Sequence, residues 1–446
     1  MKSSGSGPNG PESSGAENPT ETSSLALDVE EWSHAQLGAR AFDSARVPLV
    51  AVEPVEGAIA VEAAVSPDSS FRLVRSALER AESELLLYIY NVTAEHMLDL
   101  LRDCVSRGVS VRVMYDTHDT RGDEKAKLES LAGVELKTAP STGGRNVFTV
   151  CHQKFAVIDE STLLIGSANW ANSAIPLVTE AGRFKKGNRE WLLVLESTEL
   201  AGRFMDLFEA DWNIPDTPTL GAPREPERAP AEPVVVPVFL AEPPARVFDL
   251  QEFPAGPAVK VTPILSPQNY FEAVRALIES ATESIFIEQQ YILERGPRTT
   301  ELLQALAARA AEVDIRIIVS STFRKVGAKD SWELSVESLT GHSLDSRLKA
   351  MNLRYYTHCH NKGVVVDRRA VVVSSTNWSE NSIAQAREAG VLVESPAVAG
   401  YFADVFEWDW EIGWDPEDVP ANLASVLEEA IFRPAAFDEI HPADLV

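Results

Sequence analysis

The apolar and polar positions of this chain follow one pattern that occurs twice. Each copy opens with a Ser-Pro dipeptide, Ser66-Pro67 or Ser266-Pro267, followed by an amphipathic stretch with helical spacing. Proline is tolerated in a first helical turn, so we expect a helix to start at each dipeptide. Each helix leads into an apolar run typical of a buried strand, at 85–90 and at 285–291. The pattern therefore predicts an internal duplication.

A second helical segment and a second strand follow in each copy. Apolar positions recur with helical spacing over 97–105 and 302–306, and short apolar runs come next at 109–115 and 315–319. The glycine that ends the first helical segment, Gly108, is typical of a helix C-terminal cap. Two strands joined through a helix are expected to pair in parallel. The repeat thus favours an α/β fold in each half.

Composition shifts mark the expected domain boundaries. The stretch 214–257 is crowded with Pro and Glu, which is typical of an extended linker. A polar segment at 322–348 has no counterpart of equal length in the first copy, and we interpret it as an inserted loop or small subdomain that could cover a site. The expected organisation is a disordered tail at 1–25, a first domain at 26–213, the linker at 214–257, a second domain at 258–414 and an acidic C-terminal segment at 415–446.

The overall charge limits the partners of the protein. The 446 residues are enough for two substantial cores, and they include 40 Lys and Arg against 67 Asp and Glu, a net charge of -27. Such a surface disfavours non-specific attraction to nucleic acid or to an anionic membrane. A polyanionic substrate would therefore need a local basic pocket.

Cysteine use and hydropathy indicate the compartment. The three cysteines are an odd number spread through a long chain, which argues against a disulfide scaffold and for a reducing environment. No apolar run approaches the roughly 18 to 20 residues that cross a bilayer, and no apolar core follows the N-terminus. These features predict a cytoplasmic protein with at most peripheral membrane contact.

The strongest chemical signal is a pair of His-x-Lys clusters with identical internal spacing. In each cluster, four residues separate the Lys from an Asp, and six more separate this Asp from a Gly/Ser-Ser-x-Asn run. The members are His152, Lys154, Asp159, Ser167 and Asn169 in the first half, and His360, Lys362, Asp367, Ser375 and Asn377 in the second.

Elementary geometry brings the members of each cluster together. Apolar runs on both sides of the Asp, at 155–158 and 163–165 in the first copy, predict a β-hairpin. A period of two puts His and Lys on one strand face, and the returning strand brings Ser and Asn beside them. Lys supplies charge, Ser and Asn supply hydrogen bonds, and His can attack phosphorus or move a proton. Asp159 and Asp367 are expected mainly to cap the hairpin turns.

The paired motifs resemble those of the phospholipase D superfamily, and the resemblance covers about residues 60 to 413. It implies two α/β domains related by a pseudo-twofold axis, with both clusters meeting at the interface. It also implies that one histidine forms a covalent phosphohistidine while the other protonates the leaving alcohol and then activates water or an acceptor alcohol. No metal or other cofactor is implied, and one chain suffices to build the site.

The resemblance also implies residue roles. Family precedent favours His152 as nucleophile and His360 as acid/base, although the sequence itself is symmetric on this point. A downstream carboxylate, Glu190 or Glu388, is expected to orient a histidine. The implied catalytic set is His152, Lys154, Asp159, His360, Lys362 and Asp367, and the implied phosphate ligands are Lys154, Ser167, Asn169, Lys362, Ser375 and Asn377.

The two halves differ in the loop before the orienting carboxylate. Glu388 lies eleven residues beyond Asn377, whereas Glu190 lies twenty-one beyond Asn169. The additional residues include the basic pair Lys185-Lys186, which either contacts substrate or belongs to a solvated loop.

Other histidines and cysteines have simpler interpretations. His358, Cys359 and His360 could be read as metal ligands, but a single short run without a distant partner set is weak support. Cys151 and Cys359 directly precede the motif histidines, which places them on the opposite strand face, in the core. His118 follows the first-half strand at 109–115 and is a weaker candidate for a cleft residue.

The reaction class is better determined than the substrate. The superfamily includes phospholipases, phosphatidyl-transferring synthases and nucleases. The acidic composition disfavours a nuclease, and the absence of a long apolar segment disfavours a membrane-embedded cardiolipin synthase. We therefore expect a phospholipase-type enzyme that hydrolyses or transfers phosphatidyl esters, with phospholipid as its partner. The alternatives are an endonuclease and a non-catalytic phosphate-binding duplicate, although two complete clusters argue against the latter.

Overall fold

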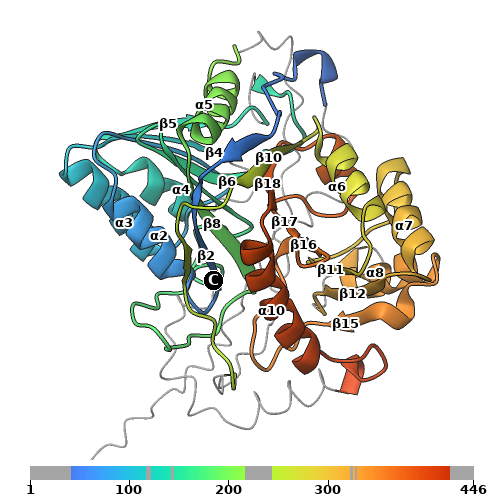
Figure 1. The fold of residues 1–446 in the computed structure, drawn as a ribbon. Coiled ribbons are helices and arrows are strands. Elements are labelled where there is room, and N and C mark those ends of the chain that lie inside the picture. Colours follow the sequence, from blue (N-terminus) through green and yellow to red (C-terminus); the bar gives the residue numbers. More distant parts are fainter. Residues whose placement is uncertain are drawn as a thin grey trace, which may run out of the picture.

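The computed structural model describes residues 42–116, 122–141, 145–215, 244–321, 325–326 and 329–421. Within these ranges the chain forms two eight-stranded mixed sheets, one in each half, which lie side by side (Figure 1). The predicted tail 1–25, His118 and residues 422–446 of the predicted C-terminal segment lie outside the described residues.

The two sheets repeat the same strand order. The first sheet runs β5-β4-β3-β6-β7-β8-β2-β9, and the second runs β15-β12-β11-β16-β17-β18-β10-β1. The strands of the first are β2 (Ala60–Ser66), β3 (Glu84–Ile89), β4 (Ser110–Tyr115), β5 (Val134–Thr138), β6 (Lys154–Ile158), β7 (Thr162–Gly166), β8 (Glu190–Glu196) and β9 (Gln251–Phe253). Those of the second are β1 (Val55–Gly57), β10 (Val259–Ser266), β11 (Ser284–Gln289), β12 (Asp314–Val319), β15 (Leu348–Ala350), β16 (Lys362–Val366), β17 (Ala370–Ser374) and β18 (Glu388–Glu394). The predicted duplication is confirmed strand by strand.

The predicted local pairings are also confirmed. Strand β3 pairs in parallel with β4, and β11 with β12, so the strand–helix–strand units form as expected. Strands β6 and β7 form an antiparallel hairpin, and β16 and β17 form its counterpart. Each hairpin therefore carries one His-x-Lys cluster at its open end.

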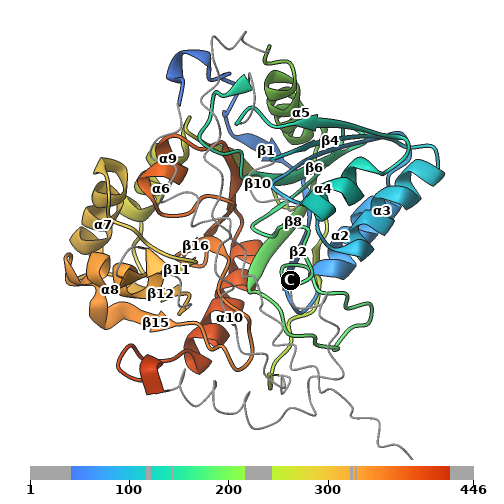
Figure 2. The ribbon, with the colours of Figure 1, turned by 180° about the vertical axis from the view of Figure 1, so that it is seen from behind.

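Helices cover the outer face of each sheet. Helices α2 (Ser70–Glu79) and α3 (Glu95–Ser106) pack on the first sheet, and α6 (Tyr270–Glu279) and α7 (Pro297–Arg309) pack on the second (Figure 2). Gly108 follows α3 with a φ of +89°, a left-handed conformation that suits a glycine cap. Three shorter helices are η1 (Ser44–Arg46), α4 (Gly122–Glu129) and α9 (Glu380–Ala384).

The predicted helix starts at the Ser-Pro dipeptides are wrong by a few residues. Strand β2 continues through Ser66, and a turn of three residues precedes the first residue of α2, Ser70. The second half does the same before Tyr270. The prolines therefore lie in the turn that reverses the chain.

One strand of each sheet comes from outside the half that the repeat predicts. Strand β1, from the first half, pairs antiparallel with β10 at the edge of the second sheet. Strand β9 lies inside the predicted linker 214–257 and pairs antiparallel with β2 of the first sheet. The sheets thus exchange edge strands, and three residues of the predicted linker form one of them.

A single hydrophobic core joins the two halves. Helices α5 (Thr198–Trp212) and α10 (Pro396–Ile412) lie between the sheets and pack on both of them (Figure 1). Their aromatic side chains belong to this core, as expected: Phe204, Phe208, Phe402 and Phe406 are all buried. The two histidine motifs therefore belong to sheets that cannot move independently without exposing this core.

The described part of the 322–348 segment is a small helical unit. It contains β13 (Lys325–Val326), β14 (Lys329–Asp330), α8 (Ser331–Thr340) and η3 (Asp345–Arg347). Helix α8 packs on the chain that follows β11, where the amide of Ile292 donates to the hydroxyl of Ser335 over 3.0 Å. Among the described residues, no helix is long and apolar enough to span a bilayer.

Where the halves meet, a large side chain of the first half packs over a glycine of the second. Gly363 of β16 occupies the register position that Phe155 holds in β6. The space above Gly363 is filled by the ring of Trp191, whose own counterpart is Ala389. A Cβ atom at Gly363 would lie 2.3 Å from a ring carbon of Trp191, much closer than such atoms pack.

We expect Gly363→Ala to destabilise the protein by about 1–3 kcal/mol, because the added methyl group overpacks a closed interface. Gly202→Ala in α5 is the matched control, since its Cβ would meet nothing within 4 Å. Alanine should stabilise that helix by about 0.5–1 kcal/mol. Urea unfolding of both variants measures the difference, and equal stability would contradict the packing described here.

Candidate active site

The residues of each predicted cluster gather at one edge of their sheet. In the first sheet, β6 begins just after His152, β7 ends just before Ser167, and β8 begins at Glu190. Because β6 and β8 run antiparallel to β7, their starts lie at the same edge as its end. The second sheet repeats the arrangement with His360 and Glu388.

The two edges meet and continue each other through backbone hydrogen bonds. The amide of His152 donates to the carbonyl of Arg387 over 2.8 Å, and the amide of His360 donates to the carbonyl of Arg189 over 3.1 Å. The centroids of the two imidazole rings are 6.5 Å apart. The expected meeting of both clusters at the domain interface is therefore confirmed.

Each histidine is bonded to a carboxylate from the opposite half. The Nδ1 of His152 lies 3.0 Å from an oxygen of Glu388, and the Nδ1 of His360 lies 2.6 Å from an oxygen of Glu190. All four side chains are buried. Such a bond favours the proton on Nδ1 and leaves Nε2 as the reacting nitrogen. Burial acts to raise the pKa of Glu190, but the charges of His360 and Lys362 lower it overall.

The arginine that precedes each glutamate also crosses between the halves. Arg387 binds both oxygens of Asp211 in α5, each at 2.9 Å, and Arg189 binds Asp409 in α10 at 2.7 Å. Arg189 additionally lies 3.1 Å from Asp68. These ion pairs are fully buried, so removing one partner would leave an uncompensated charge at high cost. They fix the segments that carry Glu190 and Glu388.

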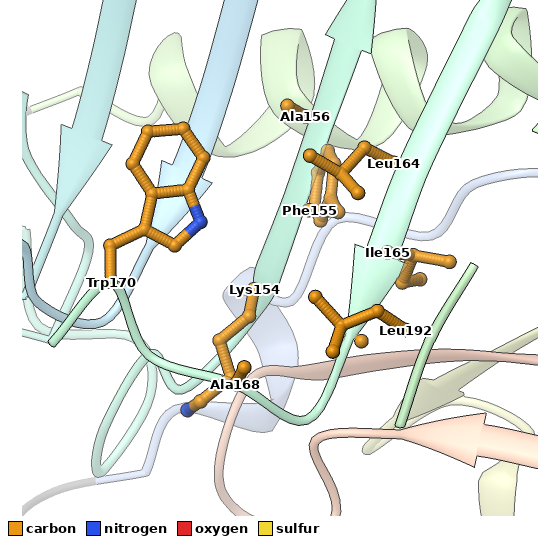
Figure 3. A pocket seen from close by; sticks show the side chains of 9 residues that line it. Lys154, Phe155, Ala156, Leu164, Ile165, Ala168, Trp170 and Leu192 are labelled. Carbon is orange, nitrogen blue, oxygen red and sulfur yellow. The ribbon is translucent and has the colours of Figure 1, made fainter. Parts of the chain in front are cut away.

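The motif lysines lie beside the histidines. The ammonium of Lys154 donates to the carbonyl of His152 over 2.8 Å, and that of Lys362 donates to the carbonyl of His360 over 2.6 Å. Figure 3 shows Lys154 at a small pocket beside Ala168 and Trp170, neither motif histidine being among its lining residues. The pocket is a void within the first half, next to the site.

The motif serines contact protein groups. The hydroxyl of Ser167 donates to Glu190 over 2.6 Å and accepts from the amide of Trp191 over 3.1 Å. The hydroxyl of Ser375 bonds to the carbonyl and the amide of Ala389, at 3.2 and 3.1 Å. Asn169 and Asn377 lie buried beyond the ends of β7 and β17. The structure thus ties Ser167 to the carboxylate that holds His360.

Asp159 and Asp367 lie at the opposite ends of their strands from the histidines. Asp159 lies seven positions beyond His152 along an extended chain, which is about 20 Å. Its carboxylate accepts the amides of Glu82, Ser83 and Glu84 at 2.8, 2.8 and 2.9 Å. Asp367 does the same for 282–284. Their inclusion in the catalytic set is therefore corrected: each carboxylate fastens the start of a neighbouring strand, rather than its own hairpin turn.

The basic pair in the longer loop is not uniformly solvated. Lys186 donates to the carbonyl of Leu353 over 2.6 Å, which ties the loop to the second half. Burial and the neighbouring charge of Arg354 lower the pKa of Lys186 to about 7. The solvated-loop interpretation is therefore wrong for Lys186.

The predicted core positions of Cys151 and Cys359 are confirmed, since both are buried in the shared core. In the part of the chain that the structure describes, no group of three or more His, Cys, Asp or Glu side chains is arranged to hold a metal ion.

Sequence reasoning missed several residues next to the histidines. The ring of Tyr90 stands edge-on to His152 with centroids 5.0 Å apart, and the amide oxygen of Gln290 accepts from Lys362 over 3.2 Å. Asn188 lies 3.5 Å from Glu190. Aligning the two copies position by position, beyond the motifs themselves, could have found them.

Comparison with known proteins agrees with this architecture. A family model described as "Cardiolipin synthase, PLD-like domain" matches residues 74–212 and 274–410. The mitochondrial cardiolipin hydrolase of Mus musculus is 30% identical over 148 residues, which are 33% of this chain and 59% of that protein. The phospholipase D of Rickettsia bellii (strain RML369-C) is 22% identical over 139 residues, which are 31% of this chain and 62% of that protein. The chain thus spans less than two thirds of the length of these curated relatives.

A solved structure covers most of the chain. Phosphatidylserine synthase of Haemophilus influenzae Rd KW20 superposes with a TM-score of 0.54 at 14% identity, over 84% of this chain and 93% of that chain. At this level of identity the likeness is one of fold.

A buried carboxyl group contacts the residue that follows His360. Glu288 of β11 is fully buried and accepts from the side-chain amide of Asn361 over 3.0 Å. Burial and then the charge of Asp409 raise the pKa of Glu288 well above its ordinary value of 4.5. The counterpart of Glu288 in the first sheet is Tyr88, so the first half has no carboxyl group at this position.

We expect this group to make the stability of the protein fall as the pH rises. The unfolded chain ionises Glu288 near pH 4.5, whereas the folded chain keeps it protonated at higher pH, so folding takes up a proton in that window. Glu288→Gln keeps the shape without ionising. Urea midpoints between about pH 5 and pH 9 should therefore depend less on pH in Glu288→Gln than in the wild type.

The exposed substitution Glu252→Gln is the matched control, because it removes one carboxyl group from the surface of the first sheet. Its pH profile should follow the wild type. Parallel profiles for all three proteins would rule out a protonated Glu288.

Proposed function

Because the chain belongs to the phospholipase D-like family, we propose that it cleaves phosphodiester bonds by phosphoryl transfer through two histidines. The observation that carries the proposal is the facing pair His152 and His360, each with its own buried carboxylate, with ring centroids 6.5 Å apart. At this separation both rings are close enough to contact one phosphodiester group, one at phosphorus and the other at the leaving oxygen.

In this mechanism His152 is the nucleophile and His360 is the acid/base. The Nε2 lone pair of His152 attacks phosphorus while the bond to the leaving alcohol breaks, and the alcohol oxygen takes a proton from Nε2 of His360. Water, or an acceptor alcohol, then gives its proton to His360 and attacks phosphorus. The phosphorus–nitrogen bond breaks, and His152 returns to its starting state.

The surrounding groups favour both steps. Glu388 holds the neutral His152 with Nε2 towards phosphorus, and Glu190 stabilises the positive charge of protonated His360. Lys154 and Lys362, with Asn169 and Asn377, bind the phosphate oxygens and stabilise the charge that develops on them. Ser167 positions Glu190, and Ser375 positions His152 through its carbonyl, 3.2 Å from Nδ1.

We propose phosphatidyl esters as the substrates, cleaved to phosphatidic acid or transferred to another alcohol. The names of the mouse and Rickettsia relatives, cardiolipin hydrolase and phospholipase D, support a phospholipid. The net charge of -27 supports it further, because a nuclease normally presents a basic track to its substrate.

The first test assays the purified protein, with EDTA present, against phosphatidylcholine vesicles and single-stranded DNA in parallel. We expect head-group release from the vesicles. His152→Ala and His360→Ala should each lower this rate at least about 100-fold, because each removes a group that attacks phosphorus or transfers a proton.

His342→Ala is the matched control, since His342 pairs with Glu294 and belongs to neither motif, so its loss should leave the rate unchanged. DNA cleavage that depends on both motif histidines would replace the lipid substrate with nucleic acid. Cleavage that survives both substitutions would refute the mechanism.

A further inference from the structure

The surroundings of His152 and His360 differ although the two halves repeat each other. Three apolar residues, Tyr90, Val150 and Ala386, form a small buried cluster beside His152. Tyr90 contacts the histidine edge-on and lies with its ring centroid 5.2 Å from the ammonium of Lys154. The His152 side of the site is therefore walled by two aliphatic side chains and a tyrosine ring, and the hydroxyl of Tyr90 is a polar group of this wall.

The equivalent positions beside His360 are all polar. Strand registers and the parallel bridges at the interface match Tyr90 to Gln290, Val150 to His358 and Ala386 to Asn188. Gln290 accepts from Lys362, the ring of His358 lies 5.6 Å from that of His360, and Asn188 reaches Glu190. These three residues are named here the polar wall.

The polar wall is buried at a cost that a bound polar group would offset. Gln290, His358 and Asn188 are at most 8% exposed. Among the residues that the structure describes, the side-chain oxygen of Asn188 has no hydrogen-bond partner. Buried amide oxygens are usually paired, and an unpaired one beside a reactive group points to a ligand that donates to it.

Positive charge extends the polar wall outward. Lys186 precedes Asn188 by two residues and donates to the carbonyl of Leu353, on the second-half segment that leads to His358. Arg354, from the segment that leads to His358, lies close enough to act on the charge of Lys186. The apolar wall beside His152 consists of three uncharged residues.

We propose that the polar wall of Gln290, His358 and Asn188 is the pocket for the polar alcohol of the substrate, both as it leaves and when an acceptor alcohol enters. The apolar wall then faces the diacylglycerol side of the phosphate. This inference rests on the proposed function and deepens it, since it names the residues that select the head group.

The same arrangement orients the reaction. The leaving oxygen departs opposite the attacking nitrogen, so an alcohol held beside His360 takes its proton from His360 while His152 bonds to phosphorus. In the reverse sense, an acceptor alcohol bound to the polar wall gives its proton to His360 and attacks the phosphohistidine. Both steps need no group beyond the substrate, the alcohol and the two histidines.

The experiment compares two lipids that differ only in the leaving alcohol, phosphatidylglycerol and phosphatidyl-1-propanol, in mixed micelles. His358→Val and Asn188→Ala replace two members of the polar wall by the residues found at the equivalent positions beside His152. We expect each to lower kcat/KM for phosphatidylglycerol by about 10- to 100-fold, the effect of losing a buried hydrogen bond. The value for phosphatidyl-1-propanol should change by less than about threefold, because that alcohol has no further hydroxyl groups to lose.

Val150→Ala is the matched control on the apolar wall, and it should leave the ratio of the two rates unchanged. Transfer of the phosphatidyl group to glycerol supplies a second readout, in which the apparent KM for glycerol should rise in Asn188→Ala. If His358→Val does not fold, His358→Gln keeps a polar group there and should retain the preference for phosphatidylglycerol.

Equal losses on both lipids would overturn the pocket, and a trapped phosphoenzyme labelled only on His360 would overturn its orientation. A wild-type protein that cleaves neither lipid would instead contradict the proposed function.

Discussion

The site depends on one constraint, the crossing of an Arg-Glu dipeptide from each half into the other. Arg189 and Arg387 bind buried aspartates of α10 and α5, and the glutamate that follows each arginine binds the histidine of the opposite motif. Neither half contains a complete histidine–carboxylate pair of its own. Burying these charges is stabilising only while both partners are present, so the halves must dock in one register before the site exists.

Edge strands and core packing reinforce the same register. Strands β1 and β9 are exchanged between the sheets, and α5 and α10 lie between the sheets in a core that both halves share. Trp191 fills the space over Gly363, next to the lysine of the second motif. These contacts explain how two sheets can hold a pair of rings 6.5 Å apart with little freedom, as in-line transfer requires.

Duplication supplies two similar half-sites, and differences between them supply direction. The motif residues match in both halves, but the walls around them do not: apolar beside His152, polar beside His360. A symmetric site would bind the two sides of an asymmetric diester equally well. A polar and an apolar wall instead favour one orientation of the phosphodiester. The two histidines can then take different roles, nucleophile and acid, although the motif residues around them are the same.

The sequence by itself determined the duplication, the parallel units, the hairpins and the two clusters, because each depends on local periodicity or on spacing within one strand pair. It also identified Glu190 and Glu388 as candidate partners of the histidines. Only the tertiary structure decided that they cross, because His152 and Glu388 are 236 positions apart and His360 and Glu190 are 170 apart. The structure also placed Asp159 at the far end of its strand, exchanged β1 and β9, and set His358 and Asn188 beside His360. Local patterns fix which face a side chain occupies, but the neighbour that meets that face is chosen by packing between distant segments.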